Sequence, residues 1–267
     1  HVIMPYHKLL DGGEESSKGK SMIGTTGNGI GPCYSDKASR IGIRMGDLLD
    51  DEIIIERLEK ALPRNLALLK HYEIDNDLSV ESLFMLCKKW RSELGEYITD
   101  ASLLINKHID SSNNILLEGA QGVHIDIEYG TYPFVTSSSP TTAGAALGSG
   151  IAPSKITDVV GVTKAYLTRV GSGPFPTEDN SEAGIKLGKK GHEFGTVTGR
   201  QRRCGWFDSI LVKQAVILSN INGIAFTKLD VLDGFKEIKI CVGYLLNGKH
   251  INHLPTSAED QKNLKPI

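Results

Sequence analysis

The second half of the chain alternates short apolar runs with helical stretches, and this alternation restricts the fold more than any other feature. Each apolar run ends in a polar turn, most of them with glycine, which is typical of a buried strand. Strands that alternate with a helix, here residues 209–218, predict an α/β sheet. The predicted strands are Ile115–Leu117, Asp158–Val162, Ile224–Thr227 and Glu237–Leu246, the last leading into an Asn247-Gly248 hairpin turn.

The carboxyl ends of these strands indicate where a ligand binds. In open α/β sheets, ligands lie beyond the carboxyl ends of the strands. We therefore expect the loops after Leu117, Val162 and Thr227 to share one functional edge.

The first half of the chain has helical periodicity. Residues 51–72 and 79–108 carry apolar side chains at helical spacing, and Ser79 is typical of a helix start. Pro63 interrupts the first pattern, which predicts a bend or a division there. Residues 7–22 are polar and are interpreted as a helix end and a loop. Both amphipathic stretches are expected to be packing helices.

Composition is that of an ordinary soluble protein. The chain is 40% hydrophobic and 23% charged with a formal net charge of −2, which excludes a generally basic nucleic-acid coat. Its four cysteines have neither zinc spacing nor the density of a disulfide framework, and no window has the length of a membrane span. We expect a cytoplasmic protein with reduced thiols. A start at His1 and an end at Ile267 without a terminal cap indicate a piece of a longer protein.

Glycines gather in short clusters, the first being Gly24–Pro32 with the sequence GTTGNGIGP. Glycine makes up 29 of 267 residues, about 11% where roughly 7% is usual. Open backbone N–H groups and two threonine hydroxyls suit a phosphate. The alternative is a flexible surface loop, because no Gly-Lys-Ser/Thr completes a Walker A sequence. Downstream, Lys37, Arg40 and Arg44 form either a solvated face or an anion grip.

A second cluster, Glu118–Asp126 with the sequence EGAQGVHID, follows a predicted strand directly. The carboxamide of Gln121 can donate and accept hydrogen bonds at once, so it could recognise an oxo group beside a ring N–H. His124 and Asp126 suggest acid–base or metal chemistry, but with no third ligand nearby, loop packing is the better interpretation. The hydroxyl-rich residues 131–139 could hold a phosphate or a ribose, or could form turns.

Arg200, Arg202 and Arg203 stand among threonines and glycines in residues 195–203. Arginine binds a carboxylate or a phosphate through paired hydrogen bonds, which lysine cannot. A nucleic-acid patch is the alternative, but aromatic residues are sparse here and the chain is not basic. The segment is predicted to be a dense anion site for a small polyanionic substrate.

Residues Thr227–Asp230, with the sequence TKLD, stand at the end of a predicted strand. The Asp230 carboxylate can accept hydrogen bonds from the ring N–H and the amino group of guanine, a donor pair that adenine lacks. The stem of Lys228 can lie over the base. Two smaller signals are the Gly/Pro-rich loop 171–178 beside Arg169, and Asp208 as a helix cap.

Taken together, six strings resemble the adenylosuccinate synthetase family in their order and spacing. They are GTTGNGIGP, EGAQG, GTYPFVTSS, TRVGSGPFPTE, GHEFGTVTGRQRRCGWFD and TKLDVLDG. The resemblance covers essentially all 267 residues. It implies an α/β fold with a large central, mostly parallel sheet, flanking helices and a P-loop-NTPase-like architecture. The chain would be a single domain over residues 1–267 that is truncated at both ends.

The resemblance also implies a reaction, the first committed step of AMP synthesis from IMP. IMP, L-aspartate and GTP give adenylosuccinate, GDP and phosphate with a magnesium ion. GTP phosphorylates the 6-oxo group of IMP, and the amine of aspartate then displaces the phosphate.

Individual positions match site residues of the family. The matches to IMP-binding residues are Thr26, Arg40, Gln121, Thr136 and Arg200. Arg40 matches the arginine that reaches the IMP site of the neighbouring subunit, which implies a homodimer. The matches to the aspartate-binding loop are Thr196, Val197, Thr198, Gly199, Arg200, Gln201 and Arg202. The matches to GTP-binding residues are Arg202, Lys228, Leu229 and Asp230.

The chain departs from the family pattern at Asn28, Val197 and Gln201, where other members often carry a basic residue, Thr and Arg respectively. The family's phosphate loop, with its general base and lysine, its general-acid histidine and the rest of its guanine pocket have no match here. We therefore expect no catalytic or metal-binding residue in this segment, magnesium ligands outside it, and no turnover by the segment alone.

Two other classes of protein are suggested by single motifs. Residues 227–230 would suit a GTP-binding switch protein, but no Gly-Lys-Ser/Thr loop accompanies them. The cluster Arg200–Arg203 would suit a nucleic-acid-binding module whose affinity falls steeply with salt. Binding of IMP separates the three hypotheses, and we expect neither a nucleic-acid nor a membrane partner.

Overall fold

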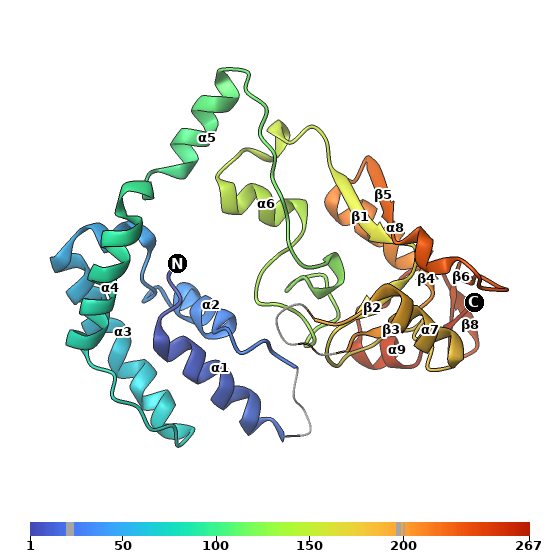
Figure 1. The fold of residues 1–267 in the computed structure, drawn as a ribbon, viewed down its shortest axis with the longest axis horizontal. Coiled ribbons are helices and arrows are strands. Elements are labelled where there is room, and N and C mark those ends of the chain that lie inside the picture. The colour runs from blue at the N-terminus through green and yellow to red at the C-terminus, as the bar shows by residue number, and fades with distance from the viewer. Residues whose placement is uncertain (20–23, 196–198, 200) are drawn as a thin grey trace. The chain divides into compact units, whose positions relative to one another are not determined.

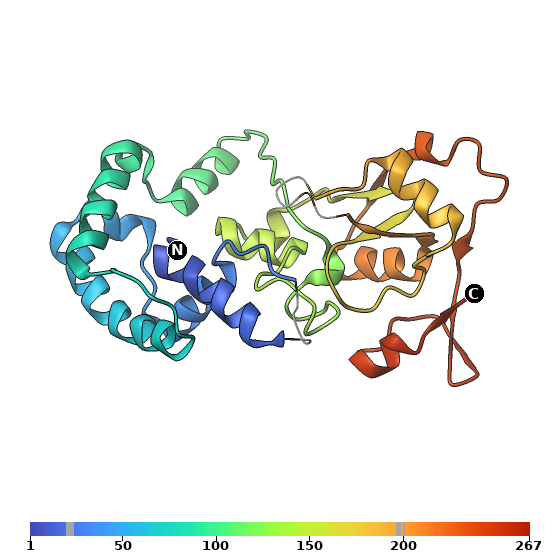
Figure 2. The ribbon, with the colours of Figure 1, turned by 60° about the horizontal axis from the view of Figure 1, so that its bottom comes forward.

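The computed structural model describes residues 1–19, 24–195, 199 and 201–267, which form two compact units, His1–Asn114 and Ile115–Ile267 (Figure 1). The described residues of the first unit are helical or irregular, and the second holds the described strands (Figure 2). The predicted α/β class is confirmed. That residues 1–267 are a single domain stays a prediction.

The first unit is built from helices joined by short turns. They are α1 (Pro5–Ser17), α2 (Ile30–Ser39), η2 (Met45–Leu49), α3 (Asp51–His71), α4 (Val80–Leu94), η3 (Gly95–Tyr97) and α5 (Ala101–Asp110). The predicted start at Ser79 is confirmed, because its hydroxyl accepts a hydrogen bond from the backbone N–H of Ser82 at 3.1 Å.

Three helix predictions for this unit need correction. Pro63 does not divide α3, which continues to His71; buried side chains on both sides of Pro63 keep the helix packed. The single stretch predicted over 79–108 is interrupted between Leu94 and Ala101, where Asp100 caps a new helix. Residues 7–17 belong to α1 rather than to a loop.

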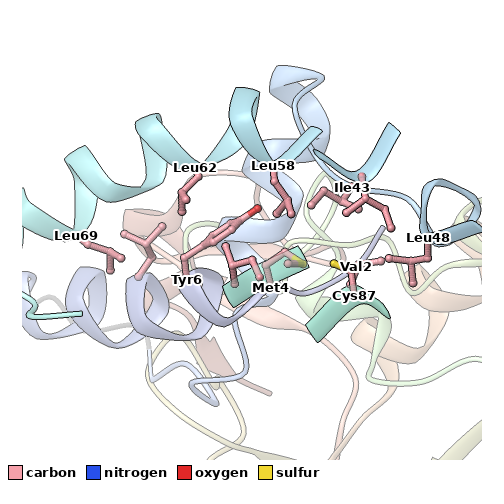
Figure 3. Close-up of a cluster of buried hydrophobic side chains, with 12 residues drawn as sticks. Val2, Met4, Tyr6, Ile43, Leu48, Leu58, Leu62, Leu69 and Cys87 are labelled. Atoms are coloured by element: carbon pink, nitrogen blue, oxygen red, sulfur yellow. The ribbon is translucent and has the colours of Figure 1, made fainter. Parts of the chain in front are cut away.

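Part of the core of this unit lies between α1 and α3 (Figure 3). Leu58, Leu62 and Leu69 extend from one face of α3 toward Met4 and Tyr6. The spacing of these leucines places them on one side of a helix with 3.6 residues per turn. All five side chains are at most 4% exposed, so their burial supplies the main stabilisation of this interface.

A buried polar network joins α1, α2 and α3. The backbone N–H of Met4 donates to Nδ1 of His7 at 2.9 Å, so the ring proton is on Nε2 and is donated to Oδ2 of Asp36 at 3.0 Å. Asn65 of α3 donates to the same carboxylate oxygen at 2.9 Å. The network therefore fixes the position of α2, the helix that begins at the end of the glycine cluster 24–32.

The second unit combines small sheets with helices. Its helices are η4 (Val123–Ile125), α6 (Thr142–Ser149), η5 (Pro153–Lys155), α7 (Glu182–Gly191), α8 (Ser209–Ser219), η6 (Leu229–Leu232) and α9 (Ala258–Lys262). Its strands are β1 (Val160–Lys164), β2 (Leu167–Arg169), β3 (Arg203–Gly205), β4 (Phe207–Asp208), β5 (Gly223–Thr227), β6 (Ile240–Cys241), β7 (Tyr244–Leu246), β8 (Lys249–Ile251) and β9 (Lys265–Pro266).

The described strands form four small sheets instead of a single large one. The pairs β1–β5 and β4–β6 are parallel, whereas β2–β3 and the order β8–β7–β9 are antiparallel. Lys164 and Thr227 are register partners at the carboxyl ends of β1 and β5. The prediction that the loops after these two strands share one edge is therefore confirmed.

Local sequence signals give mixed results in this unit. The Asn247-Gly248 turn is confirmed, with both residues in the left-handed conformation between β7 and β8. The Asp208 cap is confirmed, because its carboxylate accepts from the backbone N–H groups of Ile210 and Leu211. The strand predicted at Ile115–Leu117 is wrong: no described strand pairs with it, and Leu116 is 88% exposed.

Among the described residues, no helix is long and apolar enough to cross a membrane.

Candidate functional site

Basic side chains line a pocket at the carboxyl edge of β1 and β5. Lys164 ends β1, and Lys228 follows the last residue of β5, with its Nζ donating to the carbonyl of Gly191 at 3.1 Å. Arg202 stands just before β3. The cavity has a volume of about 410 Å³ and is lined by Lys164, Gly191, His192, Glu193, Phe194, Arg202, Thr227 and Lys228.

A buried carboxylate, Glu193, holds two of these cations. Its Oε1 lies 3.0 Å from Nζ of Lys164, and its Oε2 lies 2.8 Å from Nη1 of Arg202. The hydroxyl of Tyr166 also donates to Oε1. Burial on its own raises the pKa of Glu193, but the hydrogen bonds from Tyr166, Lys164 and Arg202 outweigh it and leave the pKa below its usual value. The carboxylate is therefore charged at neutral pH.

The charges around the cavity favour an anionic ligand. Lys164, Arg202 and Lys228 contribute three cations, and Glu193 contributes one anion. Burial lowers the pKa of Lys164, and the hydrogen bond to Glu193 opposes that shift. Because three of the described lining side chains are cationic and one is a carboxylate, the lining keeps a net positive charge.

Two of the residues predicted to bind GTP lie together at this cavity. Arg202 and Lys228 both line it. Leu229 is 58% exposed and Asp230 is also exposed, in the first turn of η6. The geometry thus brings Arg202 next to the end of β5, although they are far apart in sequence.

The predicted aspartate-binding loop is described only in part. Thr196, Val197, Thr198 and Arg200 lie outside the described residues. The N–H of Gly199 donates to the carbonyl of Gly195 at 2.7 Å, and Gly199 has φ +63°, which favours glycine. Gln201 forms an antiparallel bridge with Phe194, so the two sides of the loop are held together.

The prediction that three arginines form one dense anion site is wrong for Arg203, whose guanidinium is bound within the protein. Its guanidinium forms a bidentate pair with Glu178, with Nε at 2.7 Å from Oε1. Nη1 donates to the carbonyls of Gly171 and Gly173 at 3.3 and 2.9 Å. Arg203 therefore ties the loop 171–178 to β3, and its guanidinium is used within the protein.

Gln121 and Thr136, both predicted to bind IMP, are in direct contact. Nε2 of Gln121 donates to the hydroxyl of Thr136 at 2.9 Å, and its Oε1 accepts from Ser138 at 3.3 Å. Arg169 supports the same loop, because its Nη2 donates to the hydroxyl of Thr131 and the carbonyl of Phe134, each at 2.9 Å. Gln121 and Thr136 are thus held by hydrogen bonds to each other and to a loop that Arg169, the last residue of β2, binds.

His124 and Asp126 pack the loop that contains them, as expected. Nε2 of His124 is 2.9 Å from the carbonyl of Leu211, and burial lowers the pKa of this histidine. The Asp126 carboxylate is fully buried and accepts from the N–H groups of Glu128 and Tyr129 and from the hydroxyl of Ser139. The interpretation as loop packing is confirmed.

In the first unit, the glycine cluster donates hydrogen bonds to the acidic side chains of Asp11 and Glu15. The Asp11 carboxylate accepts from the hydroxyl of Thr25 and the N–H of Gly29, each at 2.8 Å, and Glu15 accepts from the N–H groups of Gly24 and Thr25. The expectation that all these N–H groups are open to a phosphate is therefore wrong. Two internal carboxylates accept hydrogen bonds from part of the loop, and the tip of the loop, residues 26–28, is exposed.

The other two predicted residues of this unit lie at exposed positions. Thr26 is at the tip of the glycine cluster, and its hydroxyl accepts from Nδ2 of Asn28 at 3.1 Å. Arg40 follows the last residue of α2 as its C-cap, in the left-handed conformation with φ +64°. Both side chains are accessible to a ligand or a partner.

Lys164, Tyr166 and Glu193 are not among the site residues that the sequence predicts. Lys164 follows the apolar run 158–162 and stands at the edge that the strand pattern had marked as functional, so that signal was present in the sequence. Glu193 had no such signal, because its partners come from residues 164–166 and 202. Only the fold brings these residues together.

Among the described residues, no group of three or more His, Cys, Asp or Glu side chains could hold a metal ion.

The fold and the pocket define an α/β protein with a cationic pocket at the carboxyl edge of parallel strands. The family model for adenylosuccinate synthetase matches the chain over residues 1–267. The chain therefore belongs to the adenylosuccinate synthetase family.

Individual relatives agree with this assignment. The chain is 51% identical over 268 aligned residues to the adenylosuccinate synthetase of Carboxydothermus hydrogenoformans and 49% identical over 267 residues to that of Desulforapulum autotrophicum. Each alignment covers 100% of this chain and 62% of the relative, so the chain spans less than two thirds of their length.

A solved structure of fully ligated adenylosuccinate synthetase from Plasmodium falciparum is similar to the chain with a TM-score of 0.93 and 40% identity. The match covers 100% of this chain and 63% of that one. The α/β fold is therefore the fold of this family.

Proposed function

We propose that the protein containing this chain joins IMP and L-aspartate to form adenylosuccinate, with GTP converted to GDP and phosphate. The main support for the proposal is the cationic cavity that both Arg202 and Lys228 line. The chain that contains this cavity belongs to the adenylosuccinate synthetase family. All three substrates are anionic, and the net positive lining suits their phosphates and carboxylates.

The proposed IMP contacts are Thr26, Arg40, Gln121, Thr136 and Arg200. The Gln121 carboxamide already exchanges hydrogen bonds with two hydroxyls of the loop 136–138. It can therefore recognise the 6-oxo edge of the base from a fixed position, since a carboxamide offers both donor and acceptor. The Thr136 hydroxyl lies beside it and is proposed to hold the phosphate.

The proposed contacts to aspartate and GTP meet at Arg202. The loop Thr196–Arg202 is proposed to bind aspartate, with the Arg202 guanidinium on a carboxylate of the substrate. Lys228, Leu229 and Asp230 are proposed to recognise guanine, for which the exposed Asp230 carboxylate offers two acceptor oxygens. This arrangement is supported by the fact that Arg202 and Lys228 line the same cavity.

The remaining proposals concern assembly, location and the metal ion. A homodimer in which Arg40 reaches the partner's IMP site is supported by the exposed position of Arg40 at the end of α2. We further propose a cytoplasmic enzyme of purine biosynthesis that uses Mg²⁺, with the metal ligands outside the described residues. General acid and base are likewise proposed to lie outside them.

A coupled assay for phosphate release tests the proposed function in the full-length protein. We expect release that requires IMP, aspartate and GTP together. Release from GTP that is independent of IMP would contradict the proposal and favour a GTP-binding switch protein.

Calorimetry distinguishes the third class of protein. We expect saturable binding of IMP and no oligonucleotide binding. An oligonucleotide affinity that falls steeply with salt concentration, without IMP binding, would instead favour a nucleic-acid-binding module.

A further inference from the structure

Glu193 is a buried carboxylate to which none of the predicted site roles applies. Its side chain is 2% exposed and accepts hydrogen bonds from Lys164, Tyr166 and Arg202. A carboxylate buried in this way is stable only when it is paired and hydrogen-bonded. Two cations and a hydroxyl meet that requirement.

The bonds to Arg202 fix this residue at two points. The backbone N–H of Arg202 donates to the carbonyl of Glu193 at 2.9 Å, and Nη1 donates to the Glu193 carboxylate at 2.8 Å. A guanidinium has five N–H donors, so a bond through Nη1 leaves donors for a ligand. Glu193 lies between α7 and the predicted aspartate-binding loop. Its two hydrogen bonds therefore set the position of Arg202.

Glu193 also controls the charge at this edge of the cavity. Lys164 and Arg202 are both bound to the one carboxylate, at 3.0 and 2.8 Å. Without the carboxylate, the two cations would repel each other and each would need a new partner. An arginine without a partner also loses rotamer freedom when a ligand binds, and this weakens binding.

We infer that Glu193 is a positioning residue that holds the guanidinium of Arg202 and the ammonium of Lys164 in place. In this position, Arg202 binds both the carboxylate of aspartate and GTP. The inference rests on the proposed function, from which the role of Arg202 comes. Glu193 acts through Arg202, because both of its carboxylate oxygens are already bound to side chains of the protein.

A double-mutant cycle in the full-length protein tests the inference. KM values for aspartate, GTP and IMP are measured for the wild type, Glu193→Gln, Arg202→Leu and the double variant. Glu193→Gln is expected to raise the aspartate KM about tenfold, because the charge-assisted hydrogen bond that positions Arg202 is lost. The GTP KM rises as well, while the IMP KM changes less than about twofold because Gln121 and Thr136 belong to a separate hydrogen-bond network.

The coupling decides whether Glu193 acts through Arg202. In the Arg202→Leu background, Glu193→Gln is expected to change the aspartate KM by less than about twofold, because the group that Glu193 positions is gone. A tenfold effect that persists in this background would overturn the inference. So would an aspartate KM and a GTP KM at wild-type values in the Glu193→Gln variant.

Two further variants separate positioning from folding. Tyr166→Phe removes one donor to the same carboxylate and leaves both ion pairs, so it is expected to lower thermal stability with all KM values within about twofold of the wild type. Glu193→Asp retains the charge with a shorter side chain and is expected to raise the aspartate KM by about threefold. If Glu193→Gln does not fold, Glu193→Asp decides, and wild-type KM values would overturn the inference.

The outcomes also separate this inference from the proposed function. A wild type that does not turn over IMP, aspartate and GTP removes the proposed function and the inference with it. An active wild type with an aspartate KM that Glu193 substitutions do not change removes the inference alone.

Discussion

Adjacent arginines in this chain have different roles, and residue type alone does not predict which is which. Arg202 lines the cavity and pairs with Glu193, whereas Arg203 is bound by Glu178 and two loop carbonyls. Successive side chains of an extended segment point to opposite sides, so neighbours in sequence meet different surroundings. The clustering of arginines is visible in the sequence, but the sequence does not show that Arg202 lines the cavity while Arg203 is bound within the protein.

Arg202→Leu is predicted to weaken aspartate binding far more than IMP binding in the full-length protein. Loss of a charge-assisted guanidinium–carboxylate contact is expected to raise the aspartate KM by about 10- to 100-fold. The IMP KM is expected to stay within about threefold of the wild type. Steady-state kinetics measures both values, and an unchanged aspartate KM would count against the assignment.

Arg203→Lys is the matched control for that variant. Lysine cannot reproduce the bidentate pair with Glu178, so thermal stability is expected to fall. The aspartate KM is expected to change much less than in Arg202→Leu, because the side chain is already bound within the protein.

The stabilisation by Glu193 is predicted to depend on pH. Its pKa in the folded protein is below the usual value, so its contribution is fully present above the pKa of the unfolded chain and is lost as the pH falls through the folded pKa. We expect Glu193→Gln to lower the free energy of unfolding by about 3 kcal/mol at pH 7. Urea titrations from pH 7 to about pH 3 should show the difference from the wild type shrinking; a difference that is constant with pH would contradict the ion-pair network.

Helix caps and turns were predictable at the level of secondary-structure elements because they depend on a few neighbouring residues. Ser79 and Asp208 cap α4 and α8, and Asn247-Gly248 forms the hairpin turn. Strand pairing depends on distant residues, so the apolar run Ile115–Leu117 has the sequence pattern of a buried strand but is not a strand in the structure. The same limit applies to Glu193, whose partners are set by the fold.

Asp208→Ala is predicted to cost more stability than Ser79→Ala, although both remove a helix cap. Asp208 is fully buried and also accepts from the hydroxyl of Tyr244 at 2.7 Å. Its loss therefore removes a cap and leaves a buried hydroxyl without its acceptor, about 3 kcal/mol in total, against about 1 kcal/mol for the exposed Ser79. Equal losses in the free energy of unfolding by urea denaturation would contradict a joint role for Asp208.

At the scale of the whole molecule, the described chain holds two compact units and spans 62% of the length of its relatives. The α/β class and the shared carboxyl edge of β1 and β5 were predictable, because parallel strands place their carboxyl ends together. The separation of residues 1–114 from residues 115–267 was not, since apolar periodicity marks helices and strands but not which of them share a core. The predicted IMP residues are accordingly divided between the units.

We propose that the protein containing this chain transfers a phosphoryl group from GTP to the 6-oxo oxygen of IMP before the amine of aspartate displaces it. Turnover of IMP labelled with ¹⁸O at the 6-oxo position tests this directly in the full-length protein. The bond between C6 and that oxygen breaks, so mass spectrometry is predicted to find the ¹⁸O in the released phosphate, in equal amount to the adenylosuccinate formed. Unlabelled phosphate, or phosphate released without adenylosuccinate, would contradict the claim.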